Sequence, residues 1–177
     1  MFEFLRVLVG FFEKYDIPYM LSGSMASSLY TGPRYTRDFD FVVHLKPTDV
    51  LVLKEYFKDG YFCDEDAMID AIRRKSMFNI IDHKSNFKAD FIVLKDDSFE
   101  YEKFGRRRIE KFLDFSVFVI SAEDLLLSKL QWIQDIVSET QKADILLLSK
   151  LDYLNWDYID SWIKTLKLKT YGLFKND

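Results

Sequence analysis

The chain has 177 residues, of which 49% are hydrophobic and 17% aromatic, so it can bury a substantial core and is not globally disordered. Its formal net charge of −4 lacks the basic excess that long nucleic acid usually requires of a partner. Cys63 is the single cysteine, which excludes an intrachain disulfide, and no apolar run approaches the roughly 18 residues of a membrane span. We therefore expect about one domain, in the cytoplasm, without a membrane or long nucleic acid as partner.

The N-terminal part predicts a helix, a strand, a second helix and a second strand. Apolar residues recur at helical spacing from Phe2 to Phe12. The segment "YMLSG" predicts a short buried strand, and "SMASSLYTG" predicts a helix that begins at Ser24 as N-cap and ends at Gly32. The alternation in "DFDFVVHL" predicts the next strand.

Two helices and two hairpins follow. The helices are expected over residues 47–60 and 65–74. The first hairpin pairs "MFNIID" with "KADFIVL", and the second pairs "RRRIEKF" with "SVFVIS". From Ser121, a predicted N-cap, three segments have helical period and no strand signal.

This order predicts an α/β (α+β) fold, with a mixed β-sheet flanked by helices and followed by a short helical region. We place the α/β domain at residues 1–120. Residues 121–177 are expected to form a helical subdomain that packs on it.

The strand "DFDFVVHL" contains the first candidate site. Asp38 and Asp40 share one face of this strand, while Phe39 and Phe41 share the other, apolar face. Their Cα atoms are expected about 6.5–7 Å apart, so both carboxylates could converge on a hard cation such as Mg²⁺. In the alternative, this is an exposed strand face whose aspartates pair with Arg34 or Arg37, which is common for so short a motif.

Two further segments could complete this site. Gly23-Ser24 lies at a strand-to-helix junction, where backbone N–H groups and a hydroxyl can hold phosphate, although an ordinary helix cap would look the same. Asp90 is an acidic residue within the apolar strand "KADFIVL". Beside Asp38 and Asp40 it would complete a three-carboxylate cluster, as a metal ligand or as a proton acceptor. Asp82 competes for this place, but its position at a strand end favours a turn.

Together, Gly23-Ser24, "DFD" and a later strand aspartate resemble the nucleotidyltransferase superfamily, the DNA polymerase beta-like proteins. The segment "YTRDFDFVV", the "RRR" at 106–108 and "SAEDLLLSKL" are similar to the prokaryotic minimal group that includes abortive-infection toxins. The motif core spans residues 22–90, and the weaker similarity continues to about residue 151.

The resemblance implies a reaction and a role for each residue. The reaction is transfer of a nucleoside monophosphate from an NTP to a hydroxyl of a small molecule, protein or RNA, with release of pyrophosphate. Gly23 and Ser24 would contact the phosphates, and Asp38 and Asp40 would hold magnesium. Asp90 would bind the catalytic metal of a two-metal site and activate the acceptor hydroxyl.

Three basic residues could reach the nucleotide. In the predicted strand, Arg106 and Arg108 face the same way and could reach a triphosphate, or they could form a solvated edge that discourages strand addition. Lys129, on the first helix after Ser121, could contact the phosphates or point to solvent.

Two other functions remain open at this point. One is a catalytically silent binding or regulatory module with a protein partner, such as one half of a toxin–antitoxin pair. The other is a structural α/β protein whose aspartates pair with arginines. In that case Asp90 would lie far from Asp38 and Asp40.

Overall fold

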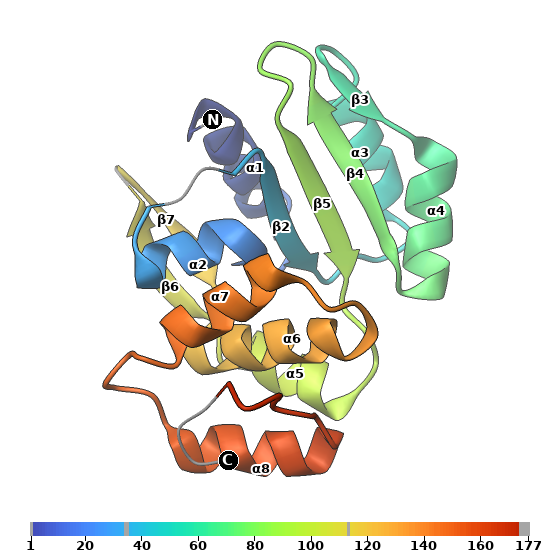
Figure 1. Cartoon of the computed structure of the whole chain (residues 1–177). Coiled ribbons are helices and arrows are strands. Elements are labelled where there is room, and N and C mark those ends of the chain that lie inside the picture. Colours follow the sequence, from blue (N-terminus) through green and yellow to red (C-terminus); the bar gives the residue numbers. More distant parts are fainter. Residues whose placement is uncertain (1, 34–35, 113, 174–177) are drawn as a thin grey trace.

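A computed structural model describes residues 2–33, 36–112 and 114–173. In these ranges the strands form one seven-stranded mixed sheet in the order β3-β4-β5-β2-β1-β7-β6 (Figure 1). The strands are β1 (Tyr19–Ser22), β2 (Asp38–Val43), β3 (Tyr61–Cys63), β4 (Met77–Asp82), β5 (Lys88–Val93), β6 (Arg108–Phe112) and β7 (Phe115–Val119). The helices are α1 (Phe2–Lys14), α2 (Gly23–Thr31), α3 (Asp49–Tyr56), α4 (Glu65–Arg74), α5 (Ser98–Gly105), α6 (Ala122–Asp135), α7 (Glu139–Leu148) and α8 (Trp156–Leu166).

Helix α1 covers the apolar face of the sheet. The ring of Phe12 lies 4.6 Å from that of Tyr19 on β1, 5.2 Å from Phe41 on β2 and 5.3 Å from Phe91 on β5, as centroid distances. All four side chains are almost fully buried. This aromatic packing on three central strands explains why Phe39, Phe41 and their neighbours on that face must be apolar. It leaves the aspartates of β2 on the opposite face.

Most of the elements predicted from the sequence are confirmed, including the α/β fold class and the three helices after Ser121. Helix α2 begins two residues earlier than expected, at Gly23, with Ser22 rather than Ser24 at the N-cap position. Helix α5 and the short strand β3 are additions to the predicted elements. The predicted second hairpin is too long, because its first strand begins at Arg108 and leaves Arg106 at the C-terminal cap of α5.

The helices after the sheet gather at one end of the molecule, where α7 and α8 both contact α6 (Figure 1). No helix in the described part of the chain combines the length and the apolar character needed to cross a membrane.

A buried carboxylate joins α8 to α5 and α6. Asp124 is fully buried and accepts hydrogen bonds from Arg106 Nε at 3.0 Å, Ser121 Oγ at 2.7 Å and the Tyr158 hydroxyl at 2.6 Å. The Arg106 guanidinium also stacks on the Tyr158 ring, with its carbon 3.9 Å from the ring centroid. Ser121 is the N-cap of α6, as predicted. These contacts compensate the burial of the Asp124 charge and hold α8 in place.

We expect Asp124→Ala to lower the free energy of unfolding by about 3 kcal/mol, because it leaves Arg106 and Tyr158 without their acceptor. Urea denaturation followed by circular dichroism measures this. Asp160→Ala, at an exposed position of α8, is the control and should change stability by less than about 0.5 kcal/mol. Equal effects of the two substitutions would contradict a structural role for the Asp124 network.

Candidate functional site

The pairing of β1, β2 and β5 brings the aspartates of β2 beside Asp90 and next to the Gly23 turn. Strands β2 and β5 run parallel, so Asp40 lies opposite Asp90, and Asp38 lies opposite Lys88. Strand β1 pairs antiparallel with β2 and sets Ser22, the residue before Gly23, opposite Asp40. Asp90 is therefore beside the β2 aspartates, as expected if the three act together, and the arrangement in which it lies far from them is wrong.

Gly23 is in direct contact with the carboxylate of Asp40. Its φ is +62°, a left-handed conformation that L side chains rarely adopt. A Cβ at this position would lie 1.8 Å from Asp40 Oδ2 and 2.4 Å from the carboxyl carbon. Only a glycine lets the backbone turn from β1 into α2 while it approaches the carboxylate so closely.

Burial and neighbouring charges act on Asp40. Loss of solvent raises its pKa most, and the negative charges of Asp90 and Asp38 raise it further. A hydrogen bond from the Ser24 backbone N–H and the positive charge of Lys129 oppose this shift. The first turn of α2 thus already holds an anionic group, as the free N–H groups of a helix N-terminus can.

Asp90 is the most enclosed of the three carboxylates, with 7% of the residue exposed. Its Oδ2 accepts a hydrogen bond from Lys88 Nζ at 2.8 Å, and the two side chains form an ion pair. Its Oδ1 is buried and has no hydrogen-bond partner among the described residues. An unsatisfied buried carboxylate oxygen is costly, and such atoms call for an additional ligand or another compensating group.

These residues offer the oxygen donors that a hard divalent cation prefers. Within residues 2–33, 36–112 and 114–173, however, no three His, Cys, Asp or Glu side chains are gathered closely enough to hold a metal ion as they stand. The expected three-carboxylate cluster is thus present in the strand register but not as a converged set of ligands. The donor chemistry and the unsatisfied Asp90 Oδ1 fit a cation, provided that the side chains turn toward it.

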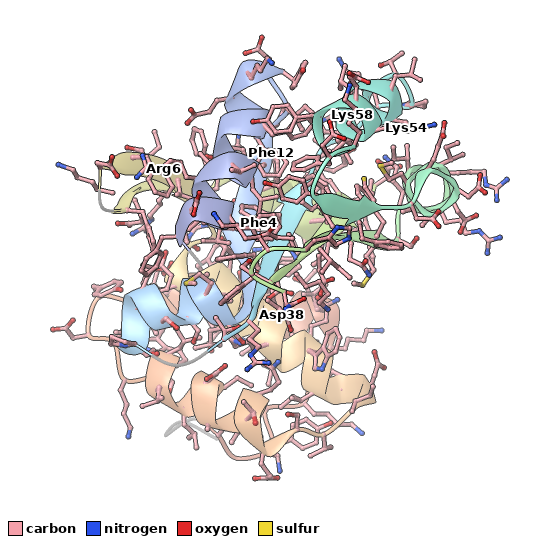
Figure 2. All side chains as sticks on the ribbon, turned by 90° about the horizontal axis from the view of Figure 1, so that it is seen from above. Phe4, Arg6, Phe12, Asp38, Lys54 and Lys58 are labelled. Atoms are coloured by element: carbon pink, nitrogen blue, oxygen red, sulfur yellow. The ribbon has the colours of Figure 1, made fainter. Side chains whose placement is uncertain are left out.

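Asp38 lies at the exposed start of β2, on the side of the sheet away from Phe4 and Phe12 of α1 (Figure 2). Its backbone N–H donates to Thr36 Oγ1 at 3.3 Å. Of the two arginines considered as its partners, Arg34 lies outside the described residues. On this face Lys88 and Asp90 form an ion pair.

The three predicted phosphate-binding cations occupy different surroundings. Lys129 is buried on α6, where Nζ donates to Asp144 Oδ2 at 2.8 Å and to Gln141 Oε1 at 2.9 Å, and its charge acts on Asp40. The alternative in which it points to solvent is therefore wrong. The guanidinium of Arg106 is held in the Asp124 network described above. Arg108 starts the edge strand β6, opposite Val119.

In the β4–β5 hairpin, the sequence predicts the turn role of Asp82 but not the contact of Lys88 with Asp90. Asp82 forms a turn, as expected from its place at a strand end, because its Oδ1 accepts from the Lys84 backbone N–H at 3.1 Å and its other oxygen binds the Ser85 hydroxyl. Lys88 is part of the site, although the sequence reasoning missed it. The signal was present, since Lys88 and Asp90 are two apart in a strand and must share a face.

The chain has the nucleotidyltransferase fold, as comparisons with solved structures show. Comparisons with protein-family models and with curated proteins find no match.

Three similar structures have TM-scores between 0.55 and 0.63. The lincosamide antibiotic adenylyltransferase LnuA, with lincomycin bound, is 21% identical, covers 82% of this chain and 94% of its own, and has a TM-score of 0.57. ANT(2″)-Ia in complex with adenylyl-2″-tobramycin is 10% identical, covers 93% and 95%, and has a TM-score of 0.63. An antigenic nucleotidyltransferase-like protein from Paracoccidioides brasiliensis is 17% identical, covers 96% and 94%, and has a TM-score of 0.55.

We expect Gly23→Ala to destabilise the protein by more than about 1 kcal/mol, since alanine is strained at this φ and its Cβ would collide with Asp40. Gly10→Ala is the matched control. Gly10 lies within α1, and a Cβ there would meet none of the described neighbours within 4 Å, so alanine should raise stability by up to about 1 kcal/mol through helix propensity. Urea titration of both variants tests this, and a neutral Gly23→Ala would refute the close contact.

Proposed function

We propose that this protein is a magnesium-dependent nucleotidyltransferase that transfers a nucleoside monophosphate from an NTP to a hydroxyl acceptor and releases pyrophosphate. One observation carries the proposal. Asp40 lies beside Asp90 across two parallel strands and against the Gly23 turn at the start of a helix, within a nucleotidyltransferase fold. A purely structural role does not explain why a buried carboxylate oxygen of Asp90 has no partner in the described part of the chain.

The three carboxylates would hold the cation. A bound magnesium ion neutralises charge on the phosphate oxygens and lowers the pKa of an attacking hydroxyl. Asp38 and Asp40 would bind it from β2, and Asp90 would bind it from β5 and accept the proton of the acceptor hydroxyl. The largely buried surroundings of Asp90 keep its electrostatic interactions strong, because few water molecules screen them.

The nucleotide would lie over the start of α2. Gly23 has no side chain that would block the phosphates at this turn, and Ser24 would add its hydroxyl, while its backbone N–H already binds Asp40. Among the predicted cations, Lys129 has the strongest support as a source of positive charge, because its charge already acts on Asp40 while Asp144 and Gln141 hold its Nζ. Arg108 remains a candidate for the phosphate chain. We leave Arg106 out, since Asp124 and Tyr158 already hold it.

We further propose that the acceptor is a small polyhydroxylated molecule. Two enzymes of this fold have lincomycin or adenylylated tobramycin in their structures, and both match over most of their length. Protein and RNA hydroxyls remain the other acceptor classes to be compared in the same assay. The abortive-infection group and the cytoplasmic location stay predictions.

The second candidate is a catalytically silent module with a protein partner, as in a toxin–antitoxin pair. Two observations favour it: the carboxylates of the described residues are not converged, and Lys88 forms an ion pair with Asp90. In this case an Asp38→Asn/Asp40→Asn double variant would behave like the wild type in every cellular assay. Calorimetry would also detect no binding of magnesium–NTP.

A transfer assay tests the leading proposal. The protein is incubated with magnesium and each α-labelled NTP, with lincosamides, aminoglycosides, RNA or a cell extract as acceptor. We expect label on one acceptor class together with release of pyrophosphate, and loss of both on addition of EDTA. Absence of NTP binding and of transfer in a correctly folded protein would refute the proposal.

Asp40→Asn should lower the transfer activity and raise the stability of the metal-free protein. We expect transfer to fall by at least about 100-fold, because a ligand of the proposed cation is lost. We also expect the melting temperature of the metal-free protein to rise by about 2–4 °C, because the variant removes a desolvated charge beside Asp90. Scanning calorimetry without metal measures the shift. A variant that is both inactive and less stable would indicate a structural role for Asp40 instead.

A further inference from the structure

We propose that Lys88 is an internal counter-ion of the carboxylate site: it occupies Asp90 in the metal-free protein, must leave when a divalent cation binds, and thereby sets the cation affinity. The proposal rests on the metal site of the proposed function. It assigns to Lys88 a positioning role, because the lysine acts through Asp90.

The geometry places Lys88 where it can act on the whole site. It lies two residues before Asp90 on the same strand and opposite Asp38 on β2, so its ammonium projects onto the face that carries all three carboxylates. Nζ lies 2.8 Å from Asp90 Oδ2. The hydrogen bond to Asp90 and the charges of Asp90, Asp38 and Asp40 all raise the pKa of Lys88, which agrees with this placement.

Without a cation, the three carboxylates repel one another in a partly desolvated place, and the Lys88 ammonium offsets part of this repulsion. The two carboxylate oxygens of Asp90 have different surroundings. Its Oδ2 is taken by Lys88, while no described group of the chain binds its buried Oδ1. The ammonium therefore satisfies only half of the carboxylate, and the other oxygen is left without a described partner.

A cation and the ammonium compete for the same carboxylate. Both are positive, so a metal ion bound to Asp90 would repel the Nζ of Lys88, which lies within hydrogen-bond distance of the same carboxylate. The Lys88 side chain is 35% exposed, against 10% for that of Asp90, so the flexible lysine can swing out to solvent while the aspartate stays. The metal therefore has to displace an ion pair before it gains its full set of ligands, and this lowers its apparent affinity.

Titration of Mn²⁺ without nucleotide, followed by electron paramagnetic resonance, tests the proposal, because it counts bound metal independently of activity. We expect Lys88→Met to bind Mn²⁺ about tenfold more tightly than the wild type, the value of one charge-assisted hydrogen bond. Lys88→Arg, which keeps the charge, should stay close to the wild type. Lys84→Met is the matched control on the same hairpin, where the side chain is 81% exposed, and it should not change the affinity.

Thermal denaturation provides a second readout. Without metal, Lys88→Met should melt at a lower temperature than the wild type because Asp90 loses its partner, and Mn²⁺ should raise its melting temperature by more than that of the wild type. If Lys88→Met does not fold, Lys88→Gln, which keeps a donor without the charge, replaces it.

The outcomes distinguish this inference from the proposed function. Unchanged or weaker Mn²⁺ binding by Lys88→Met, when the wild type binds, overturns the role of Lys88 alone. Binding by Lys88→Met but not by the wild type supports it strongly. If neither protein binds Mn²⁺ without nucleotide, the role of Lys88 is wrong, and the transfer assay decides the metal-dependent function separately.

Discussion

The site depends on the contact between the Asp40 carboxylate and the backbone of Gly23. Strand β1 ends and α2 begins at this glycine, and there is no room for a β-carbon between the turn and the carboxylate. The contact ties the first turn of α2 to the middle of the sheet. It also sets the position of Asp40 relative to Asp90, since both lie at the same level of adjacent parallel strands. Any residue that widens this turn therefore disturbs the helix and the carboxylates together.

This packing determines the surroundings of the carboxylates on the sheet face opposite α1. Asp40 is held in a place where burial and two neighbouring carboxylates raise its pKa, and a backbone N–H and Lys129 only partly compensate. Asp90 is half satisfied by Lys88 within the described chain. Such a face costs stability and is tolerated where a ligand supplies the missing charge. The aromatic packing of Phe12 on the opposite face supplies the stability that this arrangement requires.

The helices after the sheet contribute through α6. One part of α6 holds Asp124, which ties α5 and α8 to the molecule, and another holds Lys129, whose charge reaches Asp40. Lys129 is itself buried against Asp144 of α7. The position of this cation relative to the carboxylates is therefore set by helix packing.

The sequence by itself determined the strand "DFDFVV", its division into an apolar and an acidic face, and the places of Gly23 at a strand-to-helix junction and of Asp90 in an apolar strand, because period-two alternation and glycine at a junction are local properties. It did not determine that Lys88 pairs with Asp90, that Arg106 belongs to the Asp124 network, or that Lys129 is buried. The sequence also missed α5 and placed Arg106 in a strand, since short helices and strand ends carry weak local signals. Which charges meet depends on strand order and helix packing, which join residues far apart in the chain, and only the tertiary structure decided it.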